Sequence, residues 1–292
     1  MSKIMTRRPA VYLSRGDSVK GAIGFVVKWL LIIFFAVYTL FPLIWLIISS
    51  LKTNTELFGD PFSLPRVWQF SNYQNALAVS GLLKMMGNSI LIALLATLAN
   101  VVCASMLAYC LSRFRFKGRE IIFTLFSAGI LVPLNALMVP YFMTITNIGL
   151  YNTRAGLILL YSAIGITMST FIIRGLMGSL SREIEEAAYI DGCGFFGRFF
   201  RIILPLSRNG LMTAATFQFL TCWNEFVFAN LLTSSQDVRT IQLGIRYFTN
   251  QFSTDFVSMY AAIVISVLPS ILGYVLFQKQ IVSGLTSGAV KG

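Results

Sequence analysis

The 292-residue chain has no histidine, four cysteines and only 11 acidic residues. Without histidine it lacks the side chain that most often serves as a general base or a metal ligand at neutral pH. The cysteines, Cys103, Cys110, Cys193 and Cys222, have no metal-ligand spacing. We expect them to pack as small apolar side chains, with neither a metal site nor a disulfide. A catalytic function is therefore disfavoured.

A nucleotide-binding loop is missing as well. No glycine is followed by lysine anywhere in the sequence. The Gly-x-x-x-x-Gly-Lys-Ser/Thr loop, whose backbone amides and lysine hold the phosphates of a nucleoside triphosphate, is thus excluded. We expect no hydrolysis of ATP by this chain. No low-complexity linker divides it into separate units either.

Apolar residues are abundant instead, at 56% of the chain, with a mean hydropathy of +0.75. Such a composition is too apolar for an ordinary soluble domain, and a bilayer crossing needs about 20 such residues. Charge-free runs of this order lie at 29–51, 85–112, 121–147, 155–173 and 256–278, and a sixth, 210–232, carries only Glu225. The sequence predicts an all-α membrane protein with six transmembrane helices and both termini on one side.

The basic residues indicate which side is cytoplasmic. Most of the 23 Lys and Arg residues lie in the N-terminal segment, between the second and third spans, between the fourth and fifth spans, or in the tail. Because short cytoplasmic connections are enriched in such residues, we expect both termini to be cytoplasmic. The predicted organisation is a cytoplasmic segment 1–28, a membrane domain 29–280 and a cytoplasmic tail 281–292. The net charge of +12 reflects this asymmetry, and nucleic acid is not an expected partner.

The connection between the fourth and fifth spans, residues 180–205, has its own pattern. Ser181 can cap a short helix over 182–190 whose first turn is acidic. Asp191 and Gly192 supply a left-handed stop. A second helix is predicted to run to Ile203, where Pro205 breaks it, and its apolar stripe is expected to anchor it to the spans. That stripe consists of Phe196, Phe199, Phe200 and Ile203.

The same segment contains a spaced motif. It reads Glu186-Ala187-Ala188, three residues, Gly192, nine residues, then Ile202-x-Leu204-Pro205. This motif resembles the cytoplasmic signature of the membrane subunits of binding-protein-dependent ABC importers. Within that family the chain is similar to the smaller permease of the carbohydrate-uptake, maltose-type systems, as the triplet 223–225 and the C-terminal stretch 284–292 also indicate. Cys193 and Asn209 are minor departures from the family pattern.

The resemblance implies one half of a translocation pore in a bacterial inner membrane. The implied partners are a second permease, two cytoplasmic ATPases that bind ATP and Mg, an external solute-binding protein, a carbohydrate and membrane lipid. No cofactor is expected on this chain. Segment 180–205, here named the coupling segment, would dock on an ATPase through Glu185, Glu186, Ala187, Ala188, Asp191, Gly192, Leu204 and Pro205. The alternative interpretation is an inert amphipathic helix on the membrane surface.

Within the bilayer, Glu225 is the outstanding residue, because buried ionisable groups are costly and usually face a cavity or a partner. The candidate substrate-pathway residues are Asn135, Gln218, Trp223, Asn224, Glu225 and Phe228. Polar members would contact sugar hydroxyls and aromatic members would stack on the ring. The alternatives are a hydrogen bond between helices or a gate contact with the second permease.

Two further patterns predict packing. Small residues near four-residue spacing in the second span predict close helix contact, namely Ser89, Ala93, Ala96, Asn100, Ala104 and Ala108. Pro133, Pro140 and Pro269 are expected to bend the third and sixth spans.

The substrate is not fixed by the sequence. A neutral di- or oligosaccharide is the first expectation, and glycerol 3-phosphate or a related polar solute the second, because no cluster of intramembrane Arg or Lys marks an anion site. An ion-coupled secondary transporter would need more carboxylates near the midplane than Glu225 alone. A scaffold protein would need neither a lever nor pore-facing polar residues. Residues 52–84 and 233–255 are the external segments long enough to meet a binding protein.

Overall fold

The computed structural model describes residues 15–79, 81–248 and 255–289, and every regular element within them is helical. In chain order these are α1 (Arg15–Ser49), α2 (Asn54–Gly59), α3 (Ser71–Val79), α4 (Leu82–Arg113), α5 (Arg119–Ala128), η1 (Gly129–Leu131), η2 (Leu134–Leu137), α6 (Met138–Asn147), α7 (Arg154–Ile164), α8 (Ile166–Ser179), α9 (Glu183–Ile190), α10 (Phe195–Gly197), the π-helical η3 (Arg198–Ile203), α11 (Leu204–Leu206), α12 (Arg208–Asn224), α13 (Val227–Leu232), α14 (Ile241–Gly244), η4 (Ile245–Phe248) and α15 (Phe256–Ala289). Residues 1–14 of the predicted N-terminal segment and 290–292 of the predicted tail lie outside this description.

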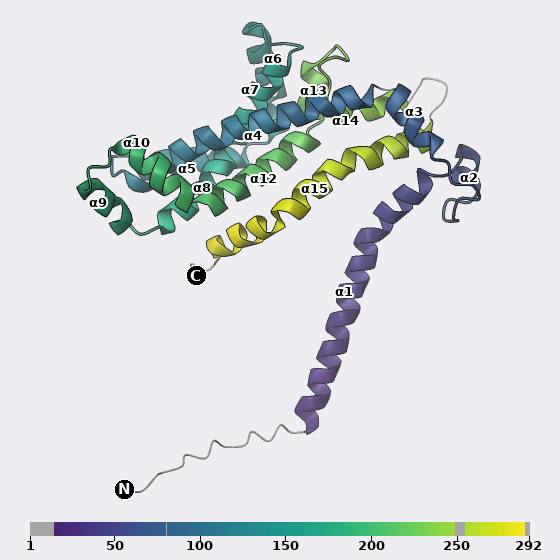
Figure 1. Ribbon diagram of the computed structural model, residues 1–292, viewed down its shortest axis with the longest axis horizontal. Helices are drawn as coiled ribbons and strands as arrows, with labels where there is room; N and C mark the ends of the chain where they lie inside the picture. Colours follow the sequence, from purple (N-terminus) through teal and green to yellow (C-terminus); the bar gives the residue numbers. More distant parts are fainter. Residues whose placement is uncertain (1–14, 80, 249–254, 290–292) are drawn as a thin grey trace.

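Helix α4 is the centre of the bundle. It packs against α7, α8 and α12, and α12 packs in turn against α15 (Figure 1). The small-residue series of the second span is buried along its whole length, as predicted. Small side chains let neighbouring backbones approach closely, which is how helices associate in lipid. At about 1.5 Å per residue, the 32 residues of α4 extend about 48 Å from one end of the bundle to the other.

The predicted spans are only partly continuous helices. By length and composition, three of the described helices can cross a membrane: Ile23–Ser49, Leu82–Arg113 and Phe256–Val275. Two bent pairs bring the number to five, with bends of 95° between Leu131 and Leu134 and of 46° between α7 and α8. The run 210–232, predicted as one span, is divided into α12, with 17 residues, and α13, so the count of six is not confirmed.

The three prolines behave differently from one another. Pro133 lies in the sharp bend of the third predicted span, as expected. Pro140 lies in the first turn of α6, where its missing N–H would have had no helical partner in any case. Pro269 lies within α15, which runs on as a single helix. Only the first of them therefore accounts for a break between helices.

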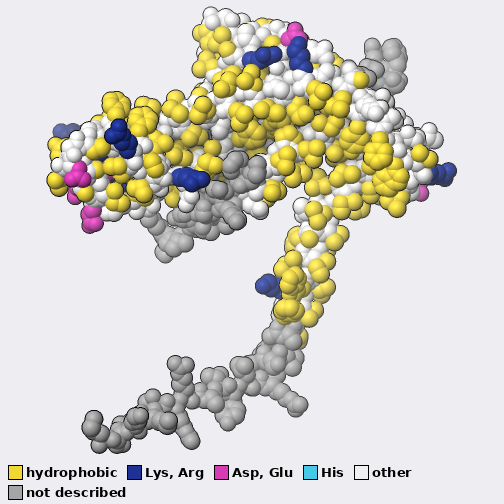
Figure 2. Space-filling view, in the orientation of Figure 1, with side chains coloured by type: hydrophobic (Ala, Val, Ile, Leu, Met, Phe, Trp, Pro, Cys, Tyr) yellow, Lys and Arg dark blue, Asp and Glu magenta, His cyan; other side chains and the backbone are white. Residues whose placement is uncertain are grey.

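Helix α1 projects from the bundle. Its end near Trp45 is fixed, because the indole Nε1 donates to the Pro61 carbonyl at 3.0 Å and the ring meets Tyr260 edge-on. Along Ile23–Ile44 its side chains are largely exposed. Figures 1 and 2 show an isolated helix whose surface is almost wholly apolar. Such a surface requires lipid or another membrane subunit to cover it.

Candidate functional site

The first helix of the coupling segment, α9, ends in a Schellman motif. Gly192 has φ +79°. Its N–H donates to the Tyr189 carbonyl at 3.0 Å, and the Cys193 N–H donates to the Ala188 carbonyl at 2.9 Å. This is the paired 5→2 and 6→1 pattern that closes a helix at a left-handed residue. Gly192 therefore sets the turn angle, as predicted. At the other end, Ser181 Oγ accepts from the Glu183 N–H at 3.2 Å.

Helix α9 is fastened to the end of α4 by a buried ion pair. Arg113 Nε lies 3.3 Å from Glu185 Oε1, and the two side chains are 4% and 12% exposed. Arg113 Nη1 also donates to the Leu180 carbonyl at 3.1 Å, just before α9 begins. The last residue of the central helix thus holds both the entry and the body of α9. Glu185, which the resemblance implies is an ATPase-docking residue, is engaged within this chain.

The second arm of the coupling segment differs from the predicted helix. It comprises α10, the π-helical η3 and α11. The predicted stripe is half right: Phe199 and Ile203 are buried, but Phe196 and Phe200 are exposed. Because a π-helix bonds to the fifth residue, its turns are wider and the side chain at i+4, not i+3, shares the buried face. Phe195, which precedes the π-helix in α10, meets the Tyr109 ring at 5.6 Å but is itself 40% exposed.

Pro205 does not break the helical course at Ile203. It occupies the first turn of α11, where a missing N–H is tolerated. The helical elements are interrupted only at Ser207, a single turn residue before α12 begins. Leu204 is partly buried against the cluster formed by α4, α8 and η3. Leu204 therefore anchors the arm where it joins α12, whereas Pro205 is exposed.

The tip of α9 faces outward. Ile190 is 83% exposed, and Tyr189, Glu186, Ala187 and Asp191 are exposed too. Ala188 is buried against the chain itself. The coupling segment thus presents an apolar tip flanked by acids, at one extremity of the molecule (Figure 1). Exposed large apolar residues on a charged helix are typical of a surface that a partner covers.

Four of the six candidate pathway residues meet in one cavity. It measures about 110 Å³ and is lined by Leu134, Asn135, Tyr161, Ile164, Gln218, Thr221, Cys222, Glu225, Val227 and Phe228. Trp223 is turned away from it, buried, with Nε1 donating to the Ser266 carbonyl of α15 at 3.1 Å. Asn224 is exposed and donates to the Leu220 carbonyl of its own helix.

Glu225 stands at the break between α12 and α13. Its Oε1 accepts from the Phe228 N–H at 2.7 Å, and its Oε2 accepts from the Ala229 N–H at 2.9 Å and from the Tyr161 hydroxyl at 2.6 Å. A carboxylate at a helix N-terminus satisfies free amides and the positive end of the helix dipole. These contacts favour the interpretation in which Glu225 bonds helix to helix, here linking α13 to α7.

The bend between α7 and α8 is supported by two amide side chains. Gln218 Nε2 donates to the Tyr161 carbonyl and Asn100 Nδ2 to the Ser162 carbonyl, both at 2.8 Å. A bent helix within a bilayer needs such donors for the carbonyls that the bend releases. The spacing of Asn100 predicts packing alone and does not predict this polar role. The available signal is an amide residue within a series of otherwise small side chains.

Glycine is required at the same bend. A Cβ on Gly165 would lie 1.6 Å from Gln218 Oε1. The α12 amide can reach the Tyr161 carbonyl only because position 165 has no side chain. Gly165 therefore makes room for the Gln218 amide, which lines the cavity.

Comparison with known proteins identifies similar membrane subunits. The family described as "Binding-protein-dependent transport system inner membrane component" matches residues 100–286. The chain is 35% identical to the diacetylchitobiose uptake system permease protein NgcG of Streptomyces coelicolor, over 89% of this chain and 87% of that protein. It is 37% identical to the trehalose/maltose transport system permease protein MalG of Thermococcus litoralis, over 89% and 94%.

A solved structure shares the fold. The chain superposes with a TM-score of 0.79 on a subunit of a bacterial ABC transporter involved in the import of the acidic polysaccharide alginate, covering 92% of this chain and 99% of that one. The sequence identity is 23%, so this likeness concerns the fold alone.

Proposed function

This chain belongs to the binding-protein-dependent transport system inner membrane component family, as a carbohydrate ABC importer permease, and we propose that it forms half of the translocation pore for a di- or oligosaccharide. A second permease supplies the other half, two ATPases bind ATP and Mg at the cytoplasmic face, and an external binding protein delivers the sugar. The complex lies in a bacterial inner membrane. The chain itself binds no nucleotide.

The observation that carries the proposal is the attachment of α9 to α4. A rigid lever must present one face to its driver and be fixed on the other. Helix α9 exposes Ile190 and Tyr189 outward and is held inward by the pair of Glu185 with Arg113. When the ATPases close on ATP, displacement of α9 passes to the end of α4. Because α4 extends through the bundle, the displacement reaches the opposite side and exchanges which end of the pore is open.

Six spans with both termini cytoplasmic fit this mechanism. Helices α12 and α13 together supply the fifth span, interrupted at Glu225 and Phe226. Discontinuous helices are tolerated in a bilayer where they line a cavity. The bent pairs and the break at Glu225 surround the cavity that holds Asn135, Gln218 and Phe228. This cavity belongs to this chain's half of the pathway. The exposed α1 supplies an apolar face for the second permease or for lipid.

The carbohydrate class follows from the relatives. Diacetylchitobiose and trehalose/maltose are named for two of them, and arabinooligosaccharides for others. All are di- or oligosaccharides, and the identities of 31–37% extend over most of this chain.

The test is ATP hydrolysis by the reconstituted complex in proteoliposomes, stimulated by the sugar-loaded binding protein. We expect Gly192→Pro to abolish the stimulation while the complex stays assembled, because proline cannot adopt φ +79° and removes the N–H that closes α9.

Gly118→Pro is the matched control. Gly118 has φ +84°, precedes α5 at the same end of the bundle, and lies outside the coupling segment. Retained stimulation in Gly118→Pro with loss in Gly192→Pro supports the lever. Full stimulation in an assembled Gly192→Pro complex would remove the coupling role from this segment.

A further inference from the structure

A second cavity lies at the end of the bundle opposite the coupling segment. It measures about 260 Å³ and is lined by Asn230, Arg239, Leu243, Arg246 and Tyr247. The segment that forms it is fixed to the start of α4, because Asn88 Nδ2 donates to the Asp237 and Arg239 carbonyls at 2.8 and 3.0 Å. Glu185 and Arg113 lie at the other end of α4. If the coupling segment is cytoplasmic, this cavity opens to the outside.

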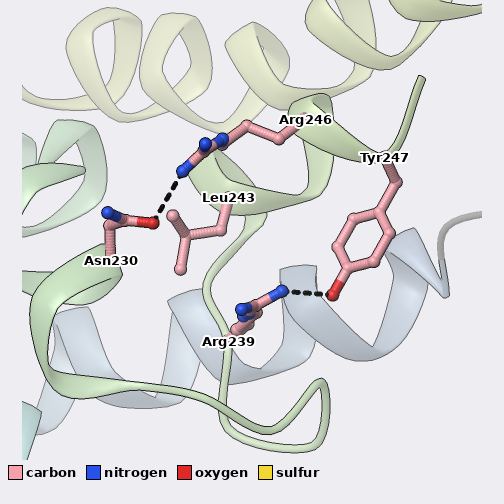
Figure 3. A pocket seen from close by; sticks show the side chains of 5 residues that line it. All are labelled: Asn230, Arg239, Leu243, Arg246 and Tyr247. Atoms are coloured by element: carbon pink, nitrogen blue, oxygen red, sulfur yellow. Dashed lines mark hydrogen bonds between the residues drawn. The ribbon is translucent and has the colours of Figure 1, made fainter. Parts of the chain in front are cut away.

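Two guanidinium groups line this small space, and no carboxylate is among its described lining residues. Arg239 Nη1 donates to the Tyr247 hydroxyl at 2.6 Å and Arg246 Nη1 to Asn230 Oδ1 at 2.8 Å, as Figure 3 shows. Arg239 Nε is buried and has no hydrogen-bond partner among the described residues. The two guanidinium groups carry like charges beside one cavity, and Arg239 Nε is a buried donor without an acceptor among the described residues. A bound anion would stabilise this arrangement.

The acid on the same segment does not neutralise this charge. Asp237 pairs with Lys84, and this hydrogen bond, with the charge of Lys84, holds the pKa of Asp237 below its usual value. Its backbone carbonyl is also held, by Arg154 Nη2 at 3.2 Å. The carboxylate of Asp237 is therefore ionised and already occupied by one cation at neutral pH.

The other lining groups suit a sugar ring. Tyr247 contributes an aromatic ring that the Arg239 guanidinium approaches to 5.7 Å, Asn230 an amide for hydroxyl groups, and the buried Leu243 an apolar floor. Carbohydrate sites combine aromatic surface with a few oriented polar groups. The cavity is also tied to the pathway: Gln242 Nε2 donates to the Trp223 carbonyl at 3.1 Å, and the Arg246 guanidinium lies 6.0 Å from the Phe226 ring at the α12–α13 break.

We propose that this basic pocket, Asn230, Arg239, Arg246 and Tyr247, binds the carboxylate or sulfonate of an acidic sugar unit at the outer mouth of the pathway. The inference rests on the proposed function for its orientation and for the carbohydrate class. It replaces the sequence-based expectation of a neutral sugar, which rests on the absence of a Lys or Arg cluster within the spans. The two arginines lie after α13, outside the apolar runs that predict the membrane helices.

The test is saturation-transfer NMR on the detergent-solubilised complex with D-glucuronate, and with D-glucose as the neutral counterpart. We expect glucuronate to bind and glucose to bind at least about tenfold more weakly, because hydrogen bonds to a charged group contribute about 1.5–3 kcal/mol. Arg239→Gln is expected to weaken glucuronate binding about tenfold or more and to leave glucose unchanged. Arg66→Gln removes the same charge from an exposed position outside the pocket and is expected to change neither.

Equal binding of glucuronate by wild type and Arg239→Gln would overturn the proposal, as would equal binding of glucuronate and glucose by the wild type. If Arg239→Gln instead weakens co-sedimentation of the complex with its unloaded binding protein and leaves glucuronate binding intact, the pocket is a protein-docking site and the proposal fails. None of these measurements depends on ATP hydrolysis. Loss of support for the pocket while ATP hydrolysis is still stimulated refutes only this proposal. Glucuronate binding without stimulated hydrolysis refutes only the proposed function.

Discussion

Replacing Glu185 by glutamine should release α9 from α4. The change keeps the size of the side chain and removes its charge, which leaves the guanidinium of Arg113 buried with one carbonyl acceptor. At 3.3 Å and an effective dielectric constant of about 20, the lost attraction is roughly 5 kcal/mol. Breaking a buried pair typically costs about 3–5 kcal/mol in stability. Arg113 Nε and Glu185 Oε1 lack good hydrogen-bond geometry, so we expect the lower end, about 3 kcal/mol.

The assay is hydrogen exchange of the amides of residues 183–193, measured by mass spectrometry on the assembled complex. Amides that exchange through local opening report its free energy, so about 3 kcal/mol corresponds to about a hundredfold faster exchange. Glu183→Gln is the matched control, because Glu183 is an exposed acid in the first turn of the same helix. We expect it to change exchange by less than about threefold, since an exposed charge at a helix end contributes only a few tenths of a kcal/mol to about 1 kcal/mol.

A double-mutant cycle decides whether the pair is the cause. Replacing Arg113 and Glu185 together by methionine removes both charges, and we expect exchange much closer to wild type than in either single variant. Exchange in Glu185→Gln indistinguishable from Glu183→Gln would refute the reasoning that this pair holds the coupling segment.

Three further outcomes are expected in the membrane domain. Gly165→Ala should destabilise the complex by about 3 kcal/mol, because it displaces the Gln218 amide. Adding Gln218→Ala should recover part of the lost melting temperature, and strictly additive losses from the two substitutions would contradict the contact. Glu225→Gln should lower the melting temperature and leave sugar uptake intact, and Tyr161→Phe, which removes the same hydrogen bond, should lower stability by about 1 kcal/mol. An assembled Glu225→Gln complex without uptake would instead make Glu225 a substrate contact. Asn100→Leu should cost about 1–3 kcal/mol, measured as the same melting temperature, because a released carbonyl loses its donor; an unchanged value would mean that the bend does not need this amide.

The positions of the membrane helices could be predicted because hydropathy acts locally. The runs at 85–112 and 256–278 coincide with α4 and α15 because an apolar stretch in lipid must bond its backbone internally. The end of α9 at Gly192 could also be predicted, because a left-handed residue that closes a helix depends only on local backbone geometry.

The breaks and the ties between helices could not be predicted in this way. The bend at Gly165 contains no proline, and its support comes from Asn100 and Gln218, which lie 62 and 57 residues from the carbonyls that they bond. The pairing of Arg113 with Glu185 is likewise tertiary. A helical spacing of 3.6 residues per turn predicts burial of Phe196 and Phe200 as well as Phe199, but both are exposed in the arm that contains the π-helical η3.

The projecting helix α1 has a consequence for the life of the subunit in the cell. Along Ile23–Ile44 the described part of the chain leaves its apolar surface largely exposed, so the folded state is complete only when another membrane subunit or lipid surrounds it. A copy synthesised in excess of its partner keeps an exposed apolar helix joined to a packed bundle, and we expect cellular proteases to remove such an unassembled copy. The amount of this protein should therefore follow the supply of its partner. Exposure of α1 distinguishes the unassembled subunit from the assembled one.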